Sequence, residues 1–395
     1  MNAIATTPLA AHLSPLQSRL PAVGTTIFTV MSSLAARYNA VNLGQGFPDF
    51  GCDPELIDAV TAAMHDGLNQ YPPMSGIAPL RAAIAQKISS LYGTQYNAET
   101  EITVTAGATQ GVLTTMLCCV HPGDEVIVIE PAYDCYVPAI ELAGGIPIFV
   151  SMRLDASGYH TPWDAVAAVV TNKTRLIIIN SPHNPTGSVL RAADLNRLSE
   201  IVDGTDILIL SDEVYEHMVF DSALHESVCR YPALAARSFV VSSFGKTYHV
   251  TGWKIGYVAA PAPLMAEFRK VHQFNVFTVN TPVQHAIAAY MQKPEPYLNL
   301  PAFYQKKRDQ FRAGLANSRL RLLPANGTYF QCVDYSAVSS MSESDFATWL
   351  TTEIGVAAIP VSAFYRTPRE SGVVRFCFAK KEATLMAALE KLTKV

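Results

Sequence analysis

Four short apolar runs alternate with helix-like stretches in the middle of the chain, and they constrain its fold more than any other feature. Each run has strand length and is bounded by polar residues; the runs are DEVIVIE, RLIIIN, DILILSDE and SFVVSS. Such runs are typical of strands buried on both faces of a mainly parallel sheet. In α/β sheets of this kind, ligands bind outside the carboxyl ends of the strands. The residues that follow each run are therefore the first candidates for a functional site.

Composition narrows the classes of protein to consider. The 395 residues are 49% hydrophobic and 16% charged, with a formal net charge of -4 and no run of like charge. We therefore expect neither nucleic acid nor an anionic membrane as a partner. No apolar run reaches the roughly 18 residues of a spanning helix, and the N-terminal residues lack the regions of a secretory signal. The 7 cysteines show no C-x-x-C spacing, which favours a cytoplasmic protein without structural disulfides or a metal site.

A helix is well marked in the stretch DPELIDAVTAAMHDG. Asp53 is a suitable N-cap, Pro54 suits the first helical position, and Gly67 follows the end. Four apolar residues of this stretch recur at helical spacing: Leu56, Ile57, Val60 and Met64.

The character of the chain changes after KPEPYLNLP, which we interpret as a hinge. A long polar helix follows, and then two strands at 329–333 and 373–379. We predict an α/β fold with a large domain over residues 46–290, built on the mainly parallel sheet. A smaller α+β domain would combine residues 1–45 with residues 291–395.

Lys246 poses a question of its own, because Gly245-Lys246-Thr247 follows an apolar run and suggests a phosphate-binding P-loop. The P-loop motif G-x-x-x-x-G-K-[ST] needs a glycine at position 240. Val240 stands there, and its branched side chain would block the close approach of backbone to phosphate. A P-loop is therefore excluded, and Lys246 is a surface charge, part of a structural ion pair or a reactive amine.

Chemically useful side chains follow each apolar run. Gly107, Ala108 and Thr109 lie between a strand and a helix start, where backbone N–H groups can seat an anion. The other strand ends contribute an aromatic ring, a rigidly placed amide, a carboxylate with a phenol, and a hydroxyl with two amines: Tyr133, Asn184, Asp212 with Tyr215, and Ser243 with Lys246 and Lys254. Each has an ordinary interpretation when taken alone: a strand–helix turn, a core aromatic or a structural ion pair.

Together these groups match the needs of one ligand, pyridoxal phosphate. Its aldehyde forms a Schiff base with a lysine. Its ring nitrogen needs an acid partner before the ring can act as an electron sink. Its phenolic oxygen needs amide and phenol donors, and its phosphate needs a helix start, a serine and a cation. The sequence therefore predicts pyridoxal phosphate as the cofactor.

The same stretches resemble those of the class I/II aminotransferases, which have fold type I of the pyridoxal-phosphate enzymes. The kynurenine-aminotransferase-like branch is the most similar, on NLGQGFPDF, QYPPMSG, SPHNPTG, SDEVYEH and SSFGKTYHVTGWKIGY. Within that branch, four further stretches resemble bacterial methionine aminotransferases: GTTIFT, YGTQYNAETEITVTAGAT, VDYSAVS and GVAAIP. The similarity runs from about Leu20 to the end of the chain.

The resemblance implies a role for each residue at the strand ends. Lys246 would hold the cofactor and move a proton between the substrate α-carbon and the cofactor, while Asp212 would pair with the ring nitrogen. Asn184 and Tyr215 would bind the ring oxygen, and Tyr133 would stack on the ring. The cofactor phosphate would be held by the helix start and three polar side chains: Gly107, Ala108, Thr109, Ser243 and Lys254.

A substrate site is implied as well. Arg375 would hold the α-carboxylate in a forked pair, assisted by the Gly46 backbone and by Asn184. Apolar and aromatic side chains would surround the rest of the substrate: Phe28, Phe277, Tyr329 and Phe364. No second arginine is evident for a side-chain carboxylate. We therefore expect methionine and aromatic amino acids to donate their amino group to a 2-oxo acid.

The resemblance also implies a homodimer with shared active sites. Tyr71 and Phe277 lie in loops that cross a two-fold interface in this family. Tyr71 would bind the cofactor phosphate of the neighbouring subunit, and Phe277 would line the neighbour's substrate pocket. The alternative is that both are aromatic residues of the local core.

Other functions remain open at this point. A carbon–sulfur β-lyase acting on cysteine conjugates or cystathionine, or a kynurenine aminotransferase, would use the same fold and cofactor residues. A regulatory protein that merely binds the cofactor would need an attached DNA-binding domain, for which the chain leaves no room beside the full fold.

Overall fold

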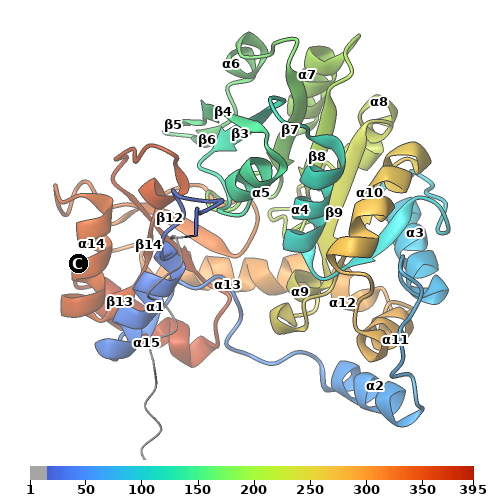
Figure 1. The fold of residues 1–395 in the computed structure, drawn as a ribbon. Helices are drawn as coiled ribbons and strands as arrows, with labels where there is room; N and C mark the ends of the chain where they lie inside the picture. Colours follow the sequence, from blue (N-terminus) through green and yellow to red (C-terminus); the bar gives the residue numbers. More distant parts are fainter. Residues whose placement is uncertain (1–15) are drawn as a thin grey trace, which may run out of the picture.

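The four apolar runs form the middle of a seven-stranded sheet in the computed structural model, which describes residues 16–395 (Figure 1). The strands are, in spatial order, β2 (Ile102–Thr105), β10 (Gly256–Ala259), β9 (Ser238–Ser243), β8 (Leu208–Asp212), β7 (Thr174–Asn180), β3 (Glu125–Glu130) and β4 (Ile146–Ser151). β10 runs antiparallel to both of its neighbours, β2 and β9, and all other neighbouring strands of the sheet pair in parallel. The predicted mainly parallel sheet is thus confirmed.

Helices cover both faces of this sheet. Successive side chains of a strand point to opposite faces, so strands that are apolar throughout present apolar side chains on both faces. In β7, Leu176 and Ile178 pack on one face, against α4 (Ala108–Cys119), α5 (Tyr136–Ala143) and α10 (Ala262–Asn275). Ile177 and Ile179 pack into the core on the other face. The helices on that second face are α2 (Pro54–His65), α3 (Ala78–Tyr92), α6 (Trp163–Ala168), α7 (Ala192–Val202), α8 (Pro232–Ala235) and α11 (Thr281–Tyr290).

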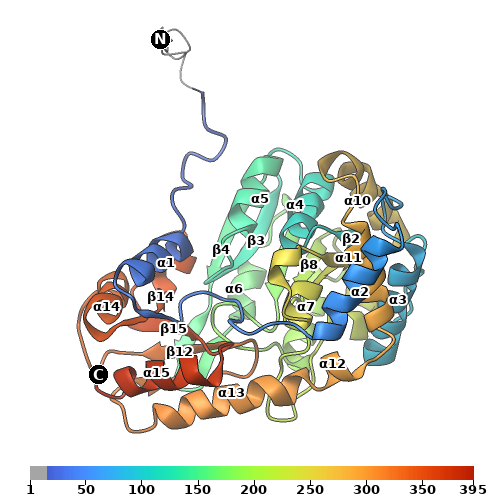
Figure 2. The ribbon, with the colours of Figure 1, turned by 90° about the horizontal axis from the view of Figure 1, so that it is seen from below.

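A smaller antiparallel sheet lies beside the large one, as Figure 2 shows. Its strands are, in order, β11 (Arg321–Leu322), β12 (Phe330–Asp334), β15 (Val373–Cys377) and β14 (Ile359–Pro360). Close by, β1 (Val41–Asn42) pairs in parallel with β13 (Val356–Ala357). The helices around this second core are α1 (Ile27–Arg37), α13 (Leu300–Gly314), α14 (Glu343–Trp349) and α15 (Glu382–Leu392).

Short elements complete the chain. The hairpin of β5 (Arg153–Asp155) and β6 (Gly158–His160) follows β4. The short helices are α9 (Phe244–Thr247), α12 (Glu295–Leu298), η1 (Val228–Arg230), η2 (Thr251–Trp253), η3 (Leu350–Ile354) and η4 (Val361–Phe364).

The predicted helix after Asp53 is α2, and the Asp53 carboxylate caps it by accepting a hydrogen bond from the Glu55 N–H. Its buried face consists of Leu56, Val60 and Ala63. Ile57 and Met64 are each 48% exposed, so the core buries only part of the apolar stripe that the helical spacing indicates on α2.

Each sheet has a core of its own, although Cys332 and Val373 of the small sheet pack into the core of the large one. The segment around the predicted hinge connects the two sheets through α12 and α13. We propose the domain division at residues 46–290 on this basis. Two predictions concern residues 1–15: the absence of a secretory signal and the start of the small domain. These residues lie outside the described residues. Within residues 16–395, no helix is both long and apolar enough to cross a membrane.

Candidate active site

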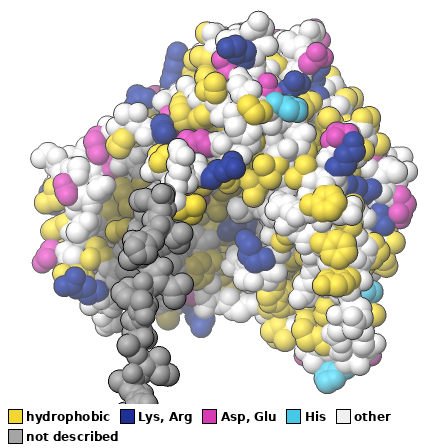
Figure 3. Space-filling view, in the orientation of Figure 1, with side chains coloured by type: hydrophobic (Ala, Val, Ile, Leu, Met, Phe, Trp, Pro, Cys, Tyr) yellow, Lys and Arg dark blue, Asp and Glu magenta, His cyan; other side chains and the backbone are white. Residues whose placement is uncertain are grey.

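A cavity of about 280 Å³ opens at the carboxyl ends of β2, β3, β7, β8 and β9. Figure 3 shows the surface hollowed near the middle of the molecule. The cavity is lined by residues that follow these strands, with additions from the small-sheet side: Phe28, Gln45, Gly46, Phe47, Gly107, Ala108, Thr109, Val112, Tyr133, Cys135, Tyr136, Asn180, Asn184, Asp212, Val214, Tyr215, Ser243, Lys246, Thr251, Lys254, Ile255 and Arg375. The structure therefore brings most of the sequence-predicted residues to one place.

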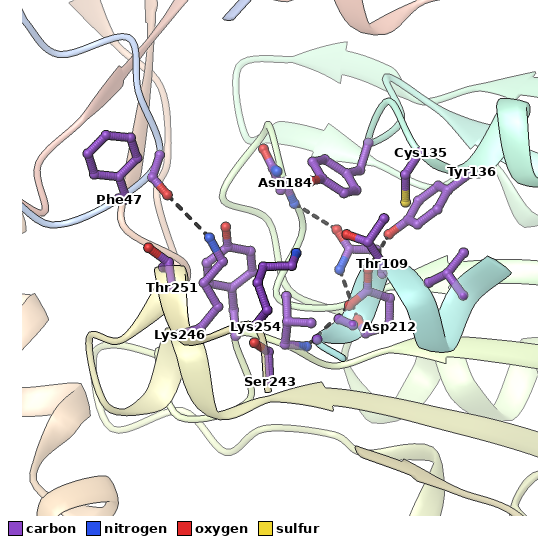
Figure 4. A pocket seen from close by; sticks show the side chains of 18 of the residues that line it. Phe47, Thr109, Cys135, Tyr136, Asn184, Asp212, Ser243, Lys246, Thr251 and Lys254 are labelled. Atoms are coloured by element: carbon purple, nitrogen blue, oxygen red, sulfur yellow. Dashed lines mark hydrogen bonds between the residues drawn. The ribbon is translucent and has the colours of Figure 1, made fainter. Parts of the chain in front are cut away.

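An anion seat forms one end of the cavity. Gly107 is the N-cap of α4 and has φ of +79°, a conformation that favours glycine. No side chain caps the helix, so its first N–H groups are left to an external acceptor. The Lys254 amine lies beside this turn, 3.4 Å from the position of a Cβ on Gly107. The hydroxyls of Thr109 and Ser243 complete the lining (Figure 4).

A buried carboxylate, that of Asp212, lies at the end of β8. Its oxygens accept hydrogen bonds from the Tyr136 hydroxyl, at 2.6 Å, and from the Val214 N–H, at 3.2 Å (Figure 4). Burial raises the pKa of Asp212 to about 6. Within residues 16–395 no cationic side chain lies within 4.0 Å of it. A buried carboxylate without a cationic partner is costly, so the site is suited to a cationic ligand group.

The Lys246 amine lies across the cavity, on the short helix α9 that follows β9. It donates hydrogen bonds to the Tyr329 hydroxyl, at 2.8 Å, and to the Gly46 carbonyl, at 3.2 Å. Removal from water lowers the pKa of Lys246 to about 8. Of the three interpretations of Lys246, the structure excludes a surface charge and an ion pair, and a reactive amine remains.

The Arg375 guanidinium is buried on β15 and faces Asn184. It donates to the Asn184 side-chain oxygen at 2.6 Å and to the Gly44 carbonyl at 3.1 Å, while its Nε has no partner among the described residues. Asn180 fixes the Asn184 loop, because its side-chain oxygen accepts from the Asn184 N–H at 2.8 Å. A buried cation with an unused donor is suited to a carboxylate ligand.

Aromatic rings surround Arg375. The guanidinium carbon lies 3.9 Å from the ring centroid of Phe330, 5.0 Å from that of Phe364 and 5.5 Å from that of Phe28. Only Phe28 lines the cavity itself. Tyr329 and Phe364 are buried and are not among the residues that line this cavity, so their place in the substrate pocket stays a prediction.

Tyr71 and Phe277 lie away from this cavity, on the surface. Their rings contact each other edge to face, with centroids 5.3 Å apart. Tyr71 is 81% exposed and Phe277 45% exposed, so neither is a core aromatic.

Several residues of the site were missed by the sequence analysis: Gln45, Phe47, Cys135, Tyr136 and Thr251. Tyr136 had a usable signal, since it lies in the stretch PAYDCY that already yielded Tyr133. The others also lie in quoted stretches: Cys135 in PAYDCY, Gln45 and Phe47 in NLGQGFPDF, and Thr251 in SSFGKTYHVTGWKIGY. Those stretches did not indicate which of their side chains face the cavity.

The residues present fit pyridoxal phosphate. The uncapped start of α4 with Lys254 suits a phosphate, the unpaired Asp212 suits a protonated ring nitrogen, and the Lys246 amine suits an aldehyde. Tyr133 and Tyr215 also line the cavity between these three points. Within residues 16–395, no group of three or more His, Cys, Asp or Glu side chains could hold a metal ion.

Comparisons with known proteins agree with this geometry. The family model "Aminotransferase class I and II" matches residues 38–392. The chain is 50% identical to methionine aminotransferase of Escherichia coli, over 96% of this chain and 98% of that protein. It is 35% identical to kynurenine–oxoglutarate transaminase of Dictyostelium discoideum, over 94% of both chains.

A crystal structure from Escherichia coli, reported with a methionine aminotransferase function, superposes with a TM-score of 0.95 at 50% identity. It covers 97% of this chain and 100% of its own. The predicted fold type I is thus confirmed, together with the similarity to methionine and kynurenine aminotransferases. The chain belongs to the class I and II aminotransferases, which are enzymes that depend on pyridoxal phosphate.

Proposed function

We propose that the protein transfers the α-amino group of methionine and aromatic amino acids to a 2-oxo acid. One observation carries this proposal: the Arg375 guanidinium, the Lys246 amine and the Asp212 carboxylate border one cavity, and within residues 16–395 none of them forms an ion pair within 4.0 Å. These three groups are what an α-amino acid and pyridoxal phosphate need to be held side by side.

Pyridoxal phosphate, when bound, supplies an aldehyde that bonds to amines and a ring that accepts an electron pair. The protein supplies orientation and proton transfer. Arg375 and Asn184 hold the α-carboxylate and so direct the α-hydrogen toward Lys246. With a pKa of about 8, the Lys246 amine is partly uncharged near neutral pH and can take up and return that proton. Ionised Asp212 keeps the ring nitrogen protonated.

The proposed donors follow from the cavity wall. Arg375 is the only arginine lining the cavity within residues 16–395, so a second carboxylate on the substrate has no partner there. Phe28 and Phe47 border the cavity on the small-sheet side and offer apolar surface to a thioether or an aromatic ring. The relatives named above for methionine and kynurenine support this choice.

We also propose a cytoplasmic homodimer. All 7 cysteines are free, which is consistent with a reducing compartment. The Tyr71 and Phe277 rings contact each other on the surface, and Phe274, three residues before Phe277, is 87% exposed. A second subunit would cover these exposed aromatic rings. The Tyr71 loop is held in place, since the Thr281 hydroxyl donates to the Gln70 carbonyl at 2.6 Å.

The role of Lys246 is tested by Lys246→Ala, with Lys270→Ala as the control. Lys270 is a surface lysine of α10 that pairs only with the exposed Glu267. We expect Lys246→Ala to lose the visible absorption of the lysine-bound cofactor and all amino transfer, while the phosphate contacts still permit binding. Lys270→Ala should behave like the unsubstituted enzyme. An unchanged spectrum in Lys246→Ala would exclude the proposed function.

Donor choice is tested by mixing the enzyme with single amino acids and following the cofactor absorbance through the half-reaction. We expect methionine and aromatic amino acids to exceed aspartate in kcat/KM, because aspartate would bury an unpaired carboxylate. Aspartate as the best donor would refute the proposed specificity. With cystathionine as the substrate, release of homocysteine, pyruvate and ammonia without a 2-oxo acid would instead show β-lyase activity.

A further inference from the structure

The Lys246 amine takes part in a closed set of hydrogen bonds behind the cavity wall. It donates to the Tyr329 hydroxyl at 2.8 Å and to the Gly46 carbonyl at 3.2 Å. The Tyr329 hydroxyl in turn donates to the same Gly46 carbonyl. The Tyr329 ring is fully buried, with its centroid 5.4 Å from the amine.

Both partners of the amine are neutral. Within residues 16–395, no carboxylate lies within 4.0 Å of it, and its hydrogen bonds go only to Tyr329 and Gly46. A carboxylate in this place would stabilise the ammonium form and raise the lysine pKa. The Tyr329 hydroxyl donates its proton to the Gly46 carbonyl and accepts a hydrogen bond from the amine, so it orients the amine without adding a charge beside it.

The partners of the amine are themselves firmly held. A Cβ on Gly46 would lie 2.8 Å from the Phe330 ring, so only glycine leaves the Gly46 carbonyl where it is. The Lys380 amine holds the same loop by donating to the carbonyls of Gln45, at 3.4 Å, and Phe47, at 2.7 Å. The Gly46 carbonyl that accepts the hydrogen bond from the Lys246 amine is therefore held in place by the fold.

We propose that Tyr329 is a positioning residue that holds the Lys246 amine, whenever this amine is not joined to the cofactor, beside the Gly46 carbonyl and ready to exchange a proton with the substrate. The proposal rests on the proposed function, because it assumes the role of Lys246 in proton transfer. It assigns Tyr329 to the lysine and not to the substrate side chain.

Tyr329→Phe tests this, and Tyr304→Phe is its matched control. The Tyr304 ring is buried next to Tyr329, with centroids 5.7 Å apart, but its hydroxyl has no hydrogen-bond partner among the described residues. Both variants remove one hydroxyl from the same core. Only Tyr329→Phe removes a hydrogen bond to Lys246.

Three quantities should be measured: kcat with methionine, the isotope effect of α-deuterated methionine on kcat/KM, and the rate at which the apoenzyme captures pyridoxal phosphate covalently. We expect Tyr329→Phe to lower kcat about ten-fold, as for loss of one hydrogen bond. The isotope effect should rise, because proton transfer becomes slower relative to other steps. Covalent capture should be slower while equilibrium cofactor affinity is retained. Tyr304→Phe should leave all of these unchanged.

Two results would overturn the proposal. One is a Tyr329→Phe enzyme with unchanged kcat, isotope effect and capture rate. The other is a Tyr329→Phe enzyme that loses thermal stability and cofactor affinity in parallel with kcat, which would show a structural role only. Failure of the proposed function is distinguishable, because it would appear in the unsubstituted enzyme as the absence of amino transfer to any 2-oxo acid.

Discussion

At the scale of single residues, the hydrogen bond from Tyr136 to Asp212 is the contact whose removal has the clearest consequence. The Tyr136 hydroxyl donates to the carboxylate at 2.6 Å, and both groups are buried. This bond lowers the pKa of Asp212, whereas burial raises it. Tyr136 therefore helps to keep Asp212 ionised, which the pairing with a protonated ring nitrogen requires.

Tyr136→Phe should shift the pH dependence of cofactor binding. A hydrogen bond to a charged group contributes about 1.5–3 kcal/mol, and 1.36 kcal/mol corresponds to one pKa unit. We expect the Asp212 pKa to rise by roughly one unit or more, so affinity for pyridoxal phosphate should begin to fall at a higher pH as acid is added. The measurement is a cofactor titration of the apoenzyme between about pH 5 and pH 8.

The sign follows from which form binds. The ionised carboxylate binds the protonated ring, so raising its pKa shortens the pH range of tight binding from the acid side. Affinity at the alkaline end should not change. If cofactor affinity falls at the same acidic pH in the Tyr136→Phe variant and in the unsubstituted protein, Tyr136 does not act through Asp212.

How far single residues were predictable depended on where they lie. Asp212, Asn184 and Lys246 follow strands, and the carboxyl ends of parallel strands share one edge, so sequence order alone brought them together. Gln45 and Phe47 reach the cavity from a loop attached to the other sheet. Their stretch NLGQGFPDF was recognised, but which of its side chains face the cavity depends on how the small-sheet side packs against the large sheet.

At the scale of elements, the loop between β14 and β15 depends on one buried carboxylate. Glu343, at the start of α14, is fully buried and accepts hydrogen bonds from the backbone N–H groups of Ser362 at 2.6 Å, Ser371 at 2.8 Å and Val373 at 3.1 Å. Burial raises the pKa of Glu343, although these bonds counteract the rise. The loop carries Phe364, which packs against Phe28 at the substrate side of the site.

Glu343→Gln should loosen this loop, because the amide nitrogen replaces one acceptor and leaves a backbone N–H unpaired. We expect a loss of about 1–3 kcal/mol in the free energy of unfolding. The KM for methionine should rise as Phe364 shifts, with cofactor affinity unchanged. Thermal unfolding and steady-state kinetics measure the two effects.

Glu370→Gln is the control for this change. Glu370 lies on the exposed part of the same loop and accepts one hydrogen bond, from the Glu343 N–H at 2.8 Å. It should affect stability and KM much less than Glu343→Gln. Equal effects of the two substitutions would mean that the buried position of Glu343 has no special role.

Elements themselves were easier to predict than their exposed faces. The four apolar runs became β3, β7, β8 and β9 within two residues of their expected bounds, because a strand buried on both faces is apolar throughout. Ile57 and Met64 of α2 share the helical spacing of Leu56 and Val60 but are half exposed. Spacing indicates that a helix is amphipathic, but how much of its stripe is covered depends on its neighbours.

At the scale of the whole molecule, shared sites in the proposed dimer can be tested by complementation. Lys246→Ala and Tyr71→Asp should each be nearly inactive, the first through the catalytic amine and the second through the neighbour's phosphate. A mixed dimer would place both defects in one site and leave the other with an intact Lys246 and an intact Tyr71. Activity after refolding the mixture should exceed the sum of the parents.

Formation of the mixed dimer must be shown independently, for example with subunits of different mass. Mixed dimers without a gain in activity would mean that Tyr71 does not act across the interface.

The backbone at Phe277 supports the expectation that this surface contacts a second subunit. Phe277 has φ of +68°, a backbone conformation that bulky residues rarely adopt, and its N–H is held by the His272 carbonyl at 3.0 Å.

Within residues 16–395 neither the buried Asp212 carboxylate nor the buried Arg375 guanidinium forms an ion pair within 4.0 Å, and this has a consequence for the stability of the native protein. Folding removes both groups from water without a direct ion pair, so burying each charge costs free energy. A ligand that supplies the missing charge is linked to the folding equilibrium, and at a concentration 100 times its Kd it adds about 2.7 kcal/mol. The cofactor and the substrate carboxylate thus each complete a part of the fold. We therefore expect the free energy of unfolding to depend on the concentrations of the cofactor and the substrate as well as on the side chains of the core.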